Sequence, residues 1–360
     1  MLRLHSLSLL QFKNYHQHHF RFTERVTGIC GKNGVGKTNL LDAIHYLCFT
    51  RSYFSRADSY NVQAGKTGFR LEGEFERSGQ SEKAVCILRE TGKKEFSVNE
   101  EGYEKFSRHI GRYPCVVIAP DDAELITGGS EERRKFMDAL LSQLDATYLQ
   151  QLILYNKVLQ QRNALLRQFA ETQTKNEELL GVLNSQLVPP GEYIFNRRKD
   201  FLLSFLAMAK RLYQDIARQP EEVSLVYESE LLQATMNELL RVNREKDGFA
   251  LRTTSGIHRD DLDIRLDGQV FRNIASQGQR KSLLFALKLA ELEALKAEKG
   301  FAPLLLLDDV FEKLDEDRIS NLLHKVCVEN DGQVFITDTN EERLYDHLAV
   351  LGLPFSILKL

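Results

Sequence analysis

The run GKNGVGKT, Gly31 to Thr38, limits what this chain can fold into more than any other feature. It fits the pattern G-x-x-x-x-G-K-[ST] and lies between a strand-like segment, VTGIC, and a helix-like segment, residues 38–49. A glycine-rich turn in this position directs backbone N–H groups at phosphates, and the N-terminus of the next helix favours an anion. The sequence therefore predicts a P-loop within an α/β domain that binds a nucleotide.

Each part of this loop has a predicted task at the phosphates. The ammonium group of Lys37 is expected to neutralise the β and γ oxygens and so to be catalytic, and the hydroxyl of Thr38 is expected to bind Mg²⁺. The predicted nucleotide-binding residues are Gly31, Lys32, Asn33, Gly34, Val35, Gly36, Lys37 and Thr38.

An acidic strand end supplies the second half of the predicted site. The segment PLLLLDDV, residues 303–310, is continuously apolar up to Asp308 and Asp309, as in a parallel strand that is buried on both faces. Asp308 is predicted to hold the Mg²⁺ ion and Asp309 to polarise the attacking water. The alternative is a strand that ends in two solvated carboxylates.

A helical stretch separates two α/β parts of the chain. Apolar periodicity predicts helices over residues 133–144, 146–168, 192–218 and 229–243, with the sequence PPG at 189–191 interrupting them. The segment 262–271 is predicted to be a hairpin that turns at Asp267 and Gly268, and 315–329 to be a helix. The α/β parts are expected to form one sheet that is interrupted in sequence. The predicted domains are residues 1–118 with 281–360, and the inserted residues 119–280.

The segment NIASQGQRKSLLFAL, residues 273–287, begins a helix with an unusual run of polar residues. Ser276 is predicted to be its N-cap, with Gln279 completing a capping box. A cap needs one such residue, and the run Ser-Gln-Gly-Gln indicates a helix end that faces a ligand. Such an end suits a γ-phosphate.

Composition excludes several classes of protein. The net charge of −3 and a pI near 6.3 leave only local patches for contact with nucleic acid. No apolar run approaches the roughly 20 residues of a membrane span, so no membrane association is expected. The five cysteines form no CxxC pair, which favours a reducing cytosol over a disulfide framework or structural zinc.

The motif order GKNGVGKT, ASQGQ, LLLLDD, FEKLD resembles the head of ATP-binding-cassette (ABC) proteins. This resemblance implies an α/β, ABC-type P-loop ATPase head with a discontinuous first lobe of mixed sheets and an inserted, mainly helical second lobe. It also implies ATP and Mg²⁺ as cofactors and an ATP-dependent homodimer. Ser276 and Gly278 would then contact, in trans, the γ-phosphate held by the partner, with Gln277 and Gln279 beside them. Residues 312–315 would lie across the dimer seam.

Within that class the chain resembles the RecF family of DNA replication and repair proteins, which are relatives of SMC proteins without the long coiled coil. The resembling segments are LLQFKNYHQHHFRF (9–22), TRSYFSR (50–56), PDDAELITGGSEERRKFMD (120–138), NKVLQQRNALLR (156–167), GIHRDDL (256–262) and SQGQRKSLLFALKLAE (276–291). The resemblance implies a role in recombinational repair of gaps after DNA damage, as part of the SOS response. The partners would be double-stranded and gapped DNA, with single-stranded DNA also open, and RecO and RecR. The protein would help load RecA in the cytoplasm, at the nucleoid.

Four positions depart from the patterns of these families. Ser130 stands where the RecF segment usually has proline, and FEKLD differs from the commoner small-residue-Glu-Leu-Asp. Pro120, Asp121 and Asp122 follow a strand after which many relatives place a glutamine, so either aspartate is a candidate for that role. The final strand runs into residues 337–339, Thr-Asp-Thr, without the switch histidine of transporters. Without that histidine, slow ATP hydrolysis is expected, and the family resemblance implies that it depends on DNA.

Local basic clusters are the candidates for contact with DNA phosphates. The first choice is Arg51, Tyr53 and Arg56. The others are Arg133 to Lys135, Arg197 to Lys199, and Lys281 with Lys288. Two competing functions remain, a transporter ATPase subunit and a P-loop kinase or GTPase that acts alone. The first leaves GIHRDDL unexplained, and the second leaves ASQGQ without a role.

Overall fold

The computed structural model describes residues 1–172, 176–217, 221–311 and 316–360. The chain divides into two compact units. Unit 1 comprises Met1–Asp122 and Leu284–Leu360, and unit 2 comprises Ala123–Leu283. The predicted limits, after residues 118 and 280, lie a few residues before these.

A five-stranded parallel sheet forms one layer of unit 1, in the order β14-β3-β13-β12-β8. Its strands are β3 (Val26–Cys30), β8 (Cys115–Ile118), β12 (Leu304–Leu307), β13 (Val334–Asp338) and β14 (Phe355–Lys359). Both α/β parts of the sequence contribute strands, as predicted. Every residue of β12 is buried, which confirms that its continuous apolar run belongs to a strand covered on both faces.

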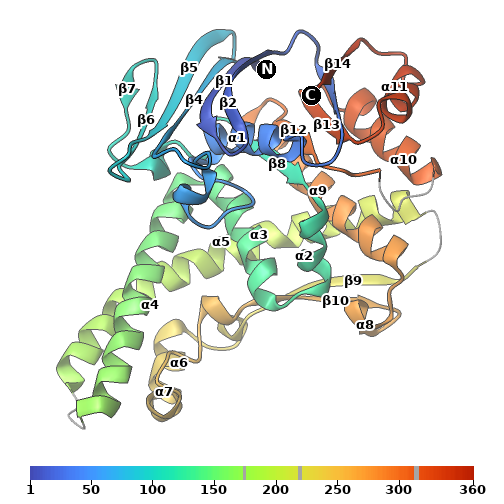
Figure 1. Ribbon diagram of the computed structural model, residues 1–360. Helices are drawn as coiled ribbons and strands as arrows, with labels where there is room; N and C mark the ends of the chain where they lie inside the picture. Colours follow the sequence, from blue (N-terminus) through green and yellow to red (C-terminus); the bar gives the residue numbers. More distant parts are fainter. Residues whose placement is uncertain (173–175, 218–220, 312–315) are drawn as a thin grey trace. The chain divides into compact units, whose positions relative to one another are not determined.

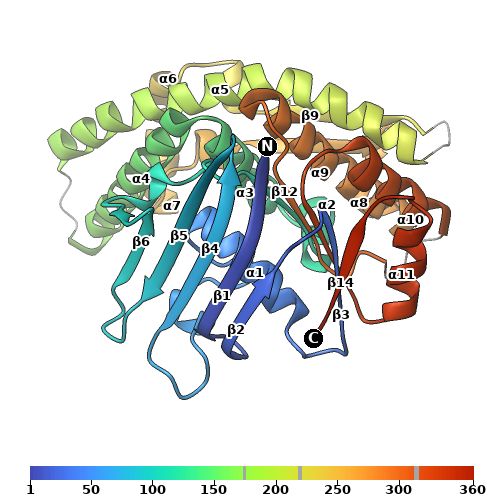
Figure 2. The ribbon, with the colours of Figure 1, turned by 90° about the horizontal axis from the view of Figure 1, so that it is seen from above.

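Most of the N-terminal strands form a second, antiparallel sheet in the order β2-β1-β4-β5-β6-β7 (Figure 2). These strands are β1 (Leu2–Phe12), β2 (Tyr15–Arg21), β4 (Phe69–Arg77), β5 (Gln80–Leu88), β6 (Lys94–Val98) and β7 (Glu101–Gly102). The prediction of one shared sheet is thus wrong for them. The β1–β2, β4–β5, β5–β6 and β6–β7 connections are too short for the crossover that parallel pairing needs, so these neighbours pair as hairpins.

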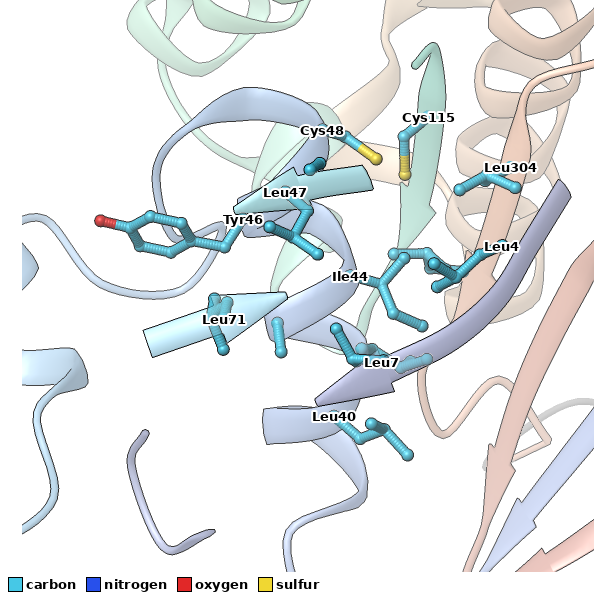
Figure 3. Close-up of a cluster of buried hydrophobic side chains, with 14 of the residues drawn as sticks. Leu4, Leu7, Leu40, Ile44, Tyr46, Leu47, Cys48, Leu71, Cys115 and Leu304 are labelled. Atoms are coloured by element: carbon cyan, nitrogen blue, oxygen red, sulfur yellow. The ribbon is translucent and has the colours of Figure 1, made fainter. Parts of the chain in front are cut away.

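Helix α1 (Lys37–Phe49) packs into the main hydrophobic core of unit 1. Leu40, Ile44 and Leu47 recur at helical spacing and bury completely, together with Leu7 of β1 and Leu71 of β4 (Figure 3). Each such side chain stabilises the fold by roughly 1.5–3 kcal/mol. The helix that carries the end of the P-loop is therefore firmly anchored.

The remaining helices of the α/β part follow the C-terminal strands in sequence. They are α10 (Glu316–Leu323) with a π-helical turn at His324–Glu329, and α11 (Glu341–Ala349), while α9 (Gln277–Lys299) begins in unit 2 and ends in unit 1. Short 3₁₀ turns lie at η1 (Asp58–Asn61), η2 (Phe106–Arg108) and η3 (Pro120–Ala123). The predicted helix over 315–329 is present from residue 316, and residue 315 lies outside the described residues.

Unit 2 is mainly helical, with α4 and α5 packed side by side (Figure 1). Its helices are α2 (Glu124–Thr127), α3 (Ser130–Leu144), α4 (Ala146–Thr172), α5 (Glu177–Ala217), α6 (Met236–Val242), α7 (Arg244–Ala250) and α8 (Phe271–Ile274). A small antiparallel sheet contains β9 (Val223–Glu228), β10 (Asp261–Leu266) and β11 (Gln269–Val270), with 3₁₀ turns at Glu230–Leu232 and Ile257–Arg259. The predicted turn at Asp267 and Gly268 joins β10 to β11.

Two predictions for unit 2 are wrong. Helix α5 runs through Pro189 and Pro190 without a break, because Pro190 and Gly191 are buried against a packed core that outweighs the lost helical hydrogen bonds. The single helix expected over 229–243 is instead a 3₁₀ turn followed by α6. The capping box of Thr235 and Glu238 starts α6 there.

Candidate nucleotide site

Two side chains where the β1–β2 turn meets β2 fix the direction of the P-loop peptides. The Asn14 side-chain amide donates to the Val35 carbonyl at 2.8 Å, and the Tyr15 hydroxyl donates to the Gly36 carbonyl at 3.0 Å. In a trans peptide the N–H points opposite to the C=O, so the amides of Gly36 and Lys37 face away from these anchors. They are thus available to an anion. Neither anchor was assigned to the loop from the sequence, although both lie in the resembling segment 9–22.

Gly36 is required at this point of the loop for two reasons. Its φ is +114°, and a Cβ atom would lie 2.6 Å from the Asn14 amide nitrogen and 3.0 Å from the Tyr15 hydroxyl. Any side chain would therefore displace the anchors that orient the loop.

The Lys37 ammonium lies folded within the loop. It donates to the carbonyls of Gly31 at 2.9 Å and Lys32 at 3.2 Å, and the residue is only 5 % exposed. Its three donors are thus partly satisfied by the turn itself, which keeps the charge next to the peptides of Gly31 to Thr38.

Thr38 and the acidic strand end meet directly, as the sequence predicts. The Thr38 hydroxyl donates to Asp308 Oδ2 at 2.8 Å, and the Thr337 hydroxyl donates to Asp308 Oδ1 at 2.8 Å. Burial raises the pKa of the Asp308 carboxyl above its ordinary value, and the hydroxyls of Thr337 and Thr38 oppose that rise. Thr337, at the end of β13, was not assigned to the site from the sequence.

Asp309 adopts an unusual backbone conformation next to this pair. Its φ is +45°, in the left-handed region that aspartate tolerates better than most residues, and its N–H donates to Thr337 Oγ1 at 2.9 Å. The threonine hydroxyl thereby links both aspartates to the neighbouring strand, and Asp309 is only partly buried.

The two aspartates after β8 differ in their surroundings. Asp122 accepts hydrogen bonds from the Ala119 N–H at 2.8 Å and from the Tyr53 hydroxyl, whereas Asp121 is exposed. The charge of Asp121 contributes to the raised pKa of Asp308, so Asp121 lies within electrostatic reach of the acidic strand end. Of the two candidates, Asp122 is bound to Tyr53, whereas the Asp121 side chain is exposed.

The predicted capping box at the start of α9 is present in unit 2. Ser276 N–H donates to Gln279 Oε1 at 2.7 Å, and Gln279 N–H donates to Ser276 Oγ at 3.2 Å. Gln279 also donates to Glu221 at 3.0 Å, and Ser276 is exposed. Gly278 follows in the first turn. The expected seam residues 312–315 lie outside the described residues.

The structure removes several basic residues from the candidate DNA contacts. Lys288 is only 6 % exposed and Arg198 only 1 %, so neither can reach a DNA phosphate. The Tyr53 hydroxyl is bound to Asp122, whereas Arg51 and Arg56 are exposed. The first-choice cluster is thus reduced to its two arginines.

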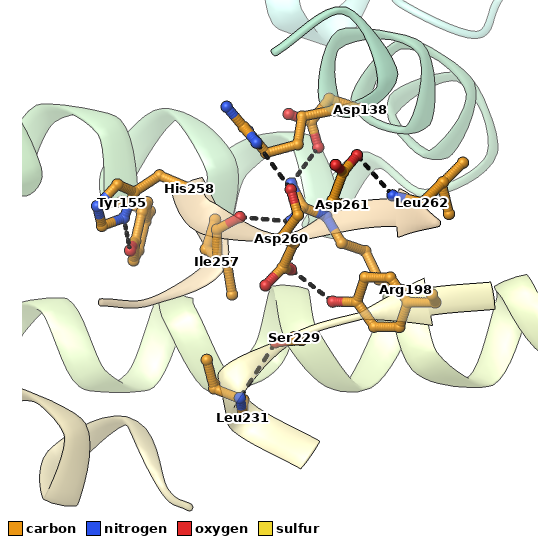
Figure 4. A network of polar contacts seen from close by, with 12 residues as sticks. Asp138, Tyr155, Arg198, Ser229, Leu231, Ile257, His258, Asp260, Asp261 and Leu262 are labelled. Carbon is orange, nitrogen blue, oxygen red and sulfur yellow. Dashed lines mark hydrogen bonds and ion pairs between the residues drawn. The ribbon is translucent and has the colours of Figure 1, made fainter. Parts of the chain in front are cut away.

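The segment GIHRDDL is part of a buried ion-pair network in unit 2 (Figure 4). The Arg198 guanidinium donates to Asp260 Oδ2 and to Asp138 Oδ1, both at 2.7 Å, and to the Ile257 carbonyl at 2.8 Å. Arg133 of α3 forms a further pair with Asp261. This network joins α3, α5 and β10, so the segment GIHRDDL stabilises the fold of the inserted unit.

The metal-binding capacity of the site depends on which side chains are grouped there. Among the described residues, no three His, Cys, Asp or Glu side chains are grouped so that they could hold a metal ion by themselves. A magnesium ion at a nucleotide commonly uses one or two protein oxygens together with phosphates, and the Thr38–Asp308 pair offers such oxygens.

None of the helices in the described parts of the chain is long and apolar enough to cross a bilayer.

The fold defines an ATPase head of the ABC type. Its features are a P-loop before a buried helix, a parallel sheet with an acidic strand whose end meets that loop, and an inserted helical unit. The family model described as RecF/RecN/SMC N terminal domain matches residues 3–355. The DNA replication and repair protein RecF of Flavobacterium johnsoniae is 45 % identical over 342 residues, 95 % of each chain. That of Bacteroides thetaiotaomicron is 40 % identical over 360 residues, covering 99 % of this chain and 96 % of the relative. The chain belongs to the RecF family.

Solved structures agree with this assignment. The recombination mediator protein RecF-ATPrS in the RecFOR pathway is 31 % identical with a TM-score of 0.87, covering 94 % of this chain and 93 % of that one. The corresponding RecF-ATP structure is 30 % identical with the same TM-score, covering 94 % and 92 %. The Smc head domain of Pyrococcus furiosus, at 16 % identity and a TM-score of 0.55, covers 96 % and 92 % and shares the fold.

Proposed function

We propose that this chain is an ATP-dependent DNA-binding protein of bacterial recombinational repair. Two heads close around ATP, hold duplex or gapped DNA, and act with RecO and RecR to help load RecA. Slow hydrolysis then resets the dimer. The observation that carries this proposal is the direct hydrogen bond between Thr38 of the P-loop and Asp308 of the acidic strand, in a chain of the RecF family. The RecF relatives solved with ATP and ATPrS support ATP as the nucleotide.

The residues of the site divide the work at the phosphates. The Gly36 and Lys37 amides bind phosphate oxygens, and the Lys37 ammonium moves from the loop carbonyls to the phosphates. Thr38 and Asp308 would hold Mg²⁺, which when bound neutralises charge on the β and γ phosphates. Asp309 accepts a proton from the attacking water.

The start of α9 supplies the contact in trans. The Ser276 oxygen accepts a hydrogen bond within its capping box, which leaves the hydroxyl hydrogen to donate to a γ-phosphate oxygen of the partner's ATP. The Gly278 amide is in the first turn of the helix, where backbone donors lack helical partners. The capping box therefore orients the serine without using up its donor.

Arg51 and Arg56 are the proposed contacts to the DNA backbone. Their loop is held by Asp42, which accepts from the Ser52 hydroxyl and from the Tyr53 N–H, both at 2.7 Å. A fixed loop presents two exposed cations per head, and a dimer doubles them. Such contacts give strong salt dependence and little base specificity.

Slow turnover follows from the side chains at the end of β13. Thr337 is bound to Asp308, and Asp338 pairs with Arg343, so the residues at the position of the switch histidine serve the fold. A switch of this kind suits the response to DNA damage at the nucleoid. The transporter and single-subunit alternatives lose their basis, since the relatives are RecF proteins over nearly the whole chain.

The test is the size of the protein in solution without nucleotide, with ADP and with ATP, each with and without gapped duplex DNA. A dimer that forms only with ATP, and a rate of ATP turnover that rises with duplex, are expected. If DNA changes neither dimer formation nor turnover, the proposal fails.

A further inference from the structure

A buried polar cluster lies in unit 1 at the two places where the chain passes between the units. The chain leaves unit 1 after Asp122 and returns at Leu284. Asp122, at the exit, lies next to Tyr53 and to Lys288 on the returning part of α9, and Lys288 in turn pairs with Glu291. These four residues are called the crossing cluster.

The crossing cluster is closely connected. Lys288 Nζ lies 3.5 Å from Glu291 Oε2, 3.9 Å from Asp122 Oδ2 and 5.9 Å from the centre of the Tyr53 ring. Tyr53 donates its hydroxyl hydrogen to Asp122 Oδ1. Lys288 and Glu291 are 6 % and 4 % exposed. Removing one charge from such a group leaves the others buried without compensation, so its geometry is strongly enforced.

The anchoring of Asp122 determines where its neighbour points. Asp122 Oδ2 accepts from the Ala119 N–H at 2.8 Å, and the Asp122 N–H donates to the Ala119 carbonyl at 3.0 Å, which closes the η3 turn directly after β8. With Asp122 turned inward, Asp121 is exposed at the end of the strand.

The end of β8 lies beside the acidic strand. β8 and β12 are parallel neighbours, and the Asp308 N–H donates to the Ile118 carbonyl at 2.8 Å. The carboxyl ends of parallel neighbours share one edge of the sheet, so the turn with Asp121 is at the same edge as Asp308 and the P-loop.

We propose that Lys288 is a positioning residue: through Asp122 it holds the η3 turn so that the Asp121 carboxylate orients a water molecule beside Asp308 at the terminal phosphate. The inference rests on the proposed ATPase function and adds two residues to it. Asp121 accepts a hydrogen bond from that water, while Lys288 acts only through Asp122.

A double-mutant cycle tests the proposal. Lys288→Met and Asp121→Asn should each lower ATP turnover at saturating ATP by on the order of 10- to 100-fold, because the water is misplaced. The affinity for ATP, measured by equilibrium binding with Mg²⁺ present, should stay within about 3-fold, since the P-loop is intact. The double variant should be no slower than either single one. Lys288→Arg, which keeps the charge, should restore part of the turnover.

The controls separate positioning from stability. Lys296 lies on α9, like Lys288, and forms a partly exposed ion pair with Asp331. Lys296→Met removes this pair and should leave turnover unchanged. Asp121→Asn should leave the melting temperature unchanged, because its side chain is exposed. If Lys288→Met does not fold, Tyr53→Phe takes its place in the cycle, as it removes the hydroxyl that holds Asp122.

Two outcomes overturn the proposal. One is unchanged turnover in Asp121→Asn, and the other is a double variant whose loss equals the product of the single losses. A wild-type protein that binds but never hydrolyses ATP, or does not bind it, would instead contradict the proposed function, and is thus distinguishable.

Discussion

The two helices that follow glycine-containing polar runs, α1 and α9, begin in opposite ways. Within the described residues, no side chain caps the start of α1, whose N-cap is Gly36 in a left-handed conformation. The start of α9 is closed by the reciprocal hydrogen bonds of Ser276 and Gln279. One helix leaves its first amides to a ligand, and the other satisfies part of them within its own chain.

This difference indicates which half of the proposed shared ATP site can bind the nucleotide without a partner subunit. The α1 end has its lysine, its threonine and the acidic strand within unit 1, so we expect it to bind a nucleotide without a partner. The α9 end adds the hydroxyl of a capped serine and the Gly278 amide, and it has neither a lysine nor an acidic strand of its own. We infer that it contributes to ATP-driven pairing of two heads more than to ATP affinity.

The largest effect is expected at the α1 end. Lys37→Ala removes a charge-assisted contact to phosphate oxygens and should weaken ATP binding on the order of 100-fold, measured by equilibrium binding to the monomer. Lys105→Ala, which removes an exposed lysine far along the chain from the loop, is the matched control and should bind ATP normally. Equal affinity in both variants would show that the α1 end is not the nucleotide site.

The α9 end should give a different pattern. Ser276→Arg should abolish ATP-driven dimers, detected by size in solution, while ATP affinity of the monomer changes by less than about 3-fold. The change also removes an N-cap that contributes about 1 kcal/mol to helix stability. Ser276→Asn keeps a cap and so separates the two effects: it should restore the melting temperature. Unchanged dimers in Ser276→Arg would refute the contact in trans.

The contact between Thr337 and the two aspartates after β12 is expected to contribute to the stability of the fold. Thr337→Val removes the hydroxyl that donates to Asp308 Oδ1 and accepts from the Asp309 N–H, and it should lower the free energy of unfolding by about 1–3 kcal/mol. Thr27→Val is a matched control on β3 of the same sheet, where the hydroxyl makes only a 3.4 Å contact with Ser356. Chemical denaturation measures both. A control that loses as much as Thr337→Val would mean that the linkage to the aspartates contributes nothing.

The smallest expected effect is on the pH dependence of stability, and it comes from Glu291 in the buried part of α9. Burial raises the pKa of Glu291 to about 7, against the opposing charge of Lys288 and with the charge of Asp122 adding to the rise. The folded state therefore binds this proton more tightly than the unfolded chain does. Its stabilising contribution is complete below the ordinary pKa of about 4.5 and is lost as the pH rises through 7.

Glu291→Gln isolates this contribution, because Gln cannot titrate. The difference in melting temperature, wild type minus Gln variant, should fall as the pH rises from 4.5 to above 7. Burial lowers the pKa of His45 and His109, each to about 4, so these groups destabilise the fold below about pH 6.5 in both proteins and cancel in the difference. A difference that is constant with pH would contradict the assignment.

Much of the candidate nucleotide site could be predicted from short stretches of the sequence. The spacing of glycines and of Lys37 and Thr38 defines a P-loop, and the apolar run before Asp308 defines a strand buried on both faces. Neighbouring parallel strands end at the same edge, so the approach of Thr38 to Asp308 could be expected. The same holds for the capping box at Ser276, which depends on residues three apart.

Packing and long-range partners decided the rest. The sequence assigned Lys288 and Arg198 to basic surfaces, but tertiary contacts bury both against carboxylates from distant segments. Pro189 and Pro190 indicated a break, but the core of unit 2 holds α5 together around them. Short-range pattern determines which elements form and which chemistry they carry. Only the folded chain determines which charges meet, because a buried pair depends on residues tens to hundreds of positions apart whose desolvation no local window contains.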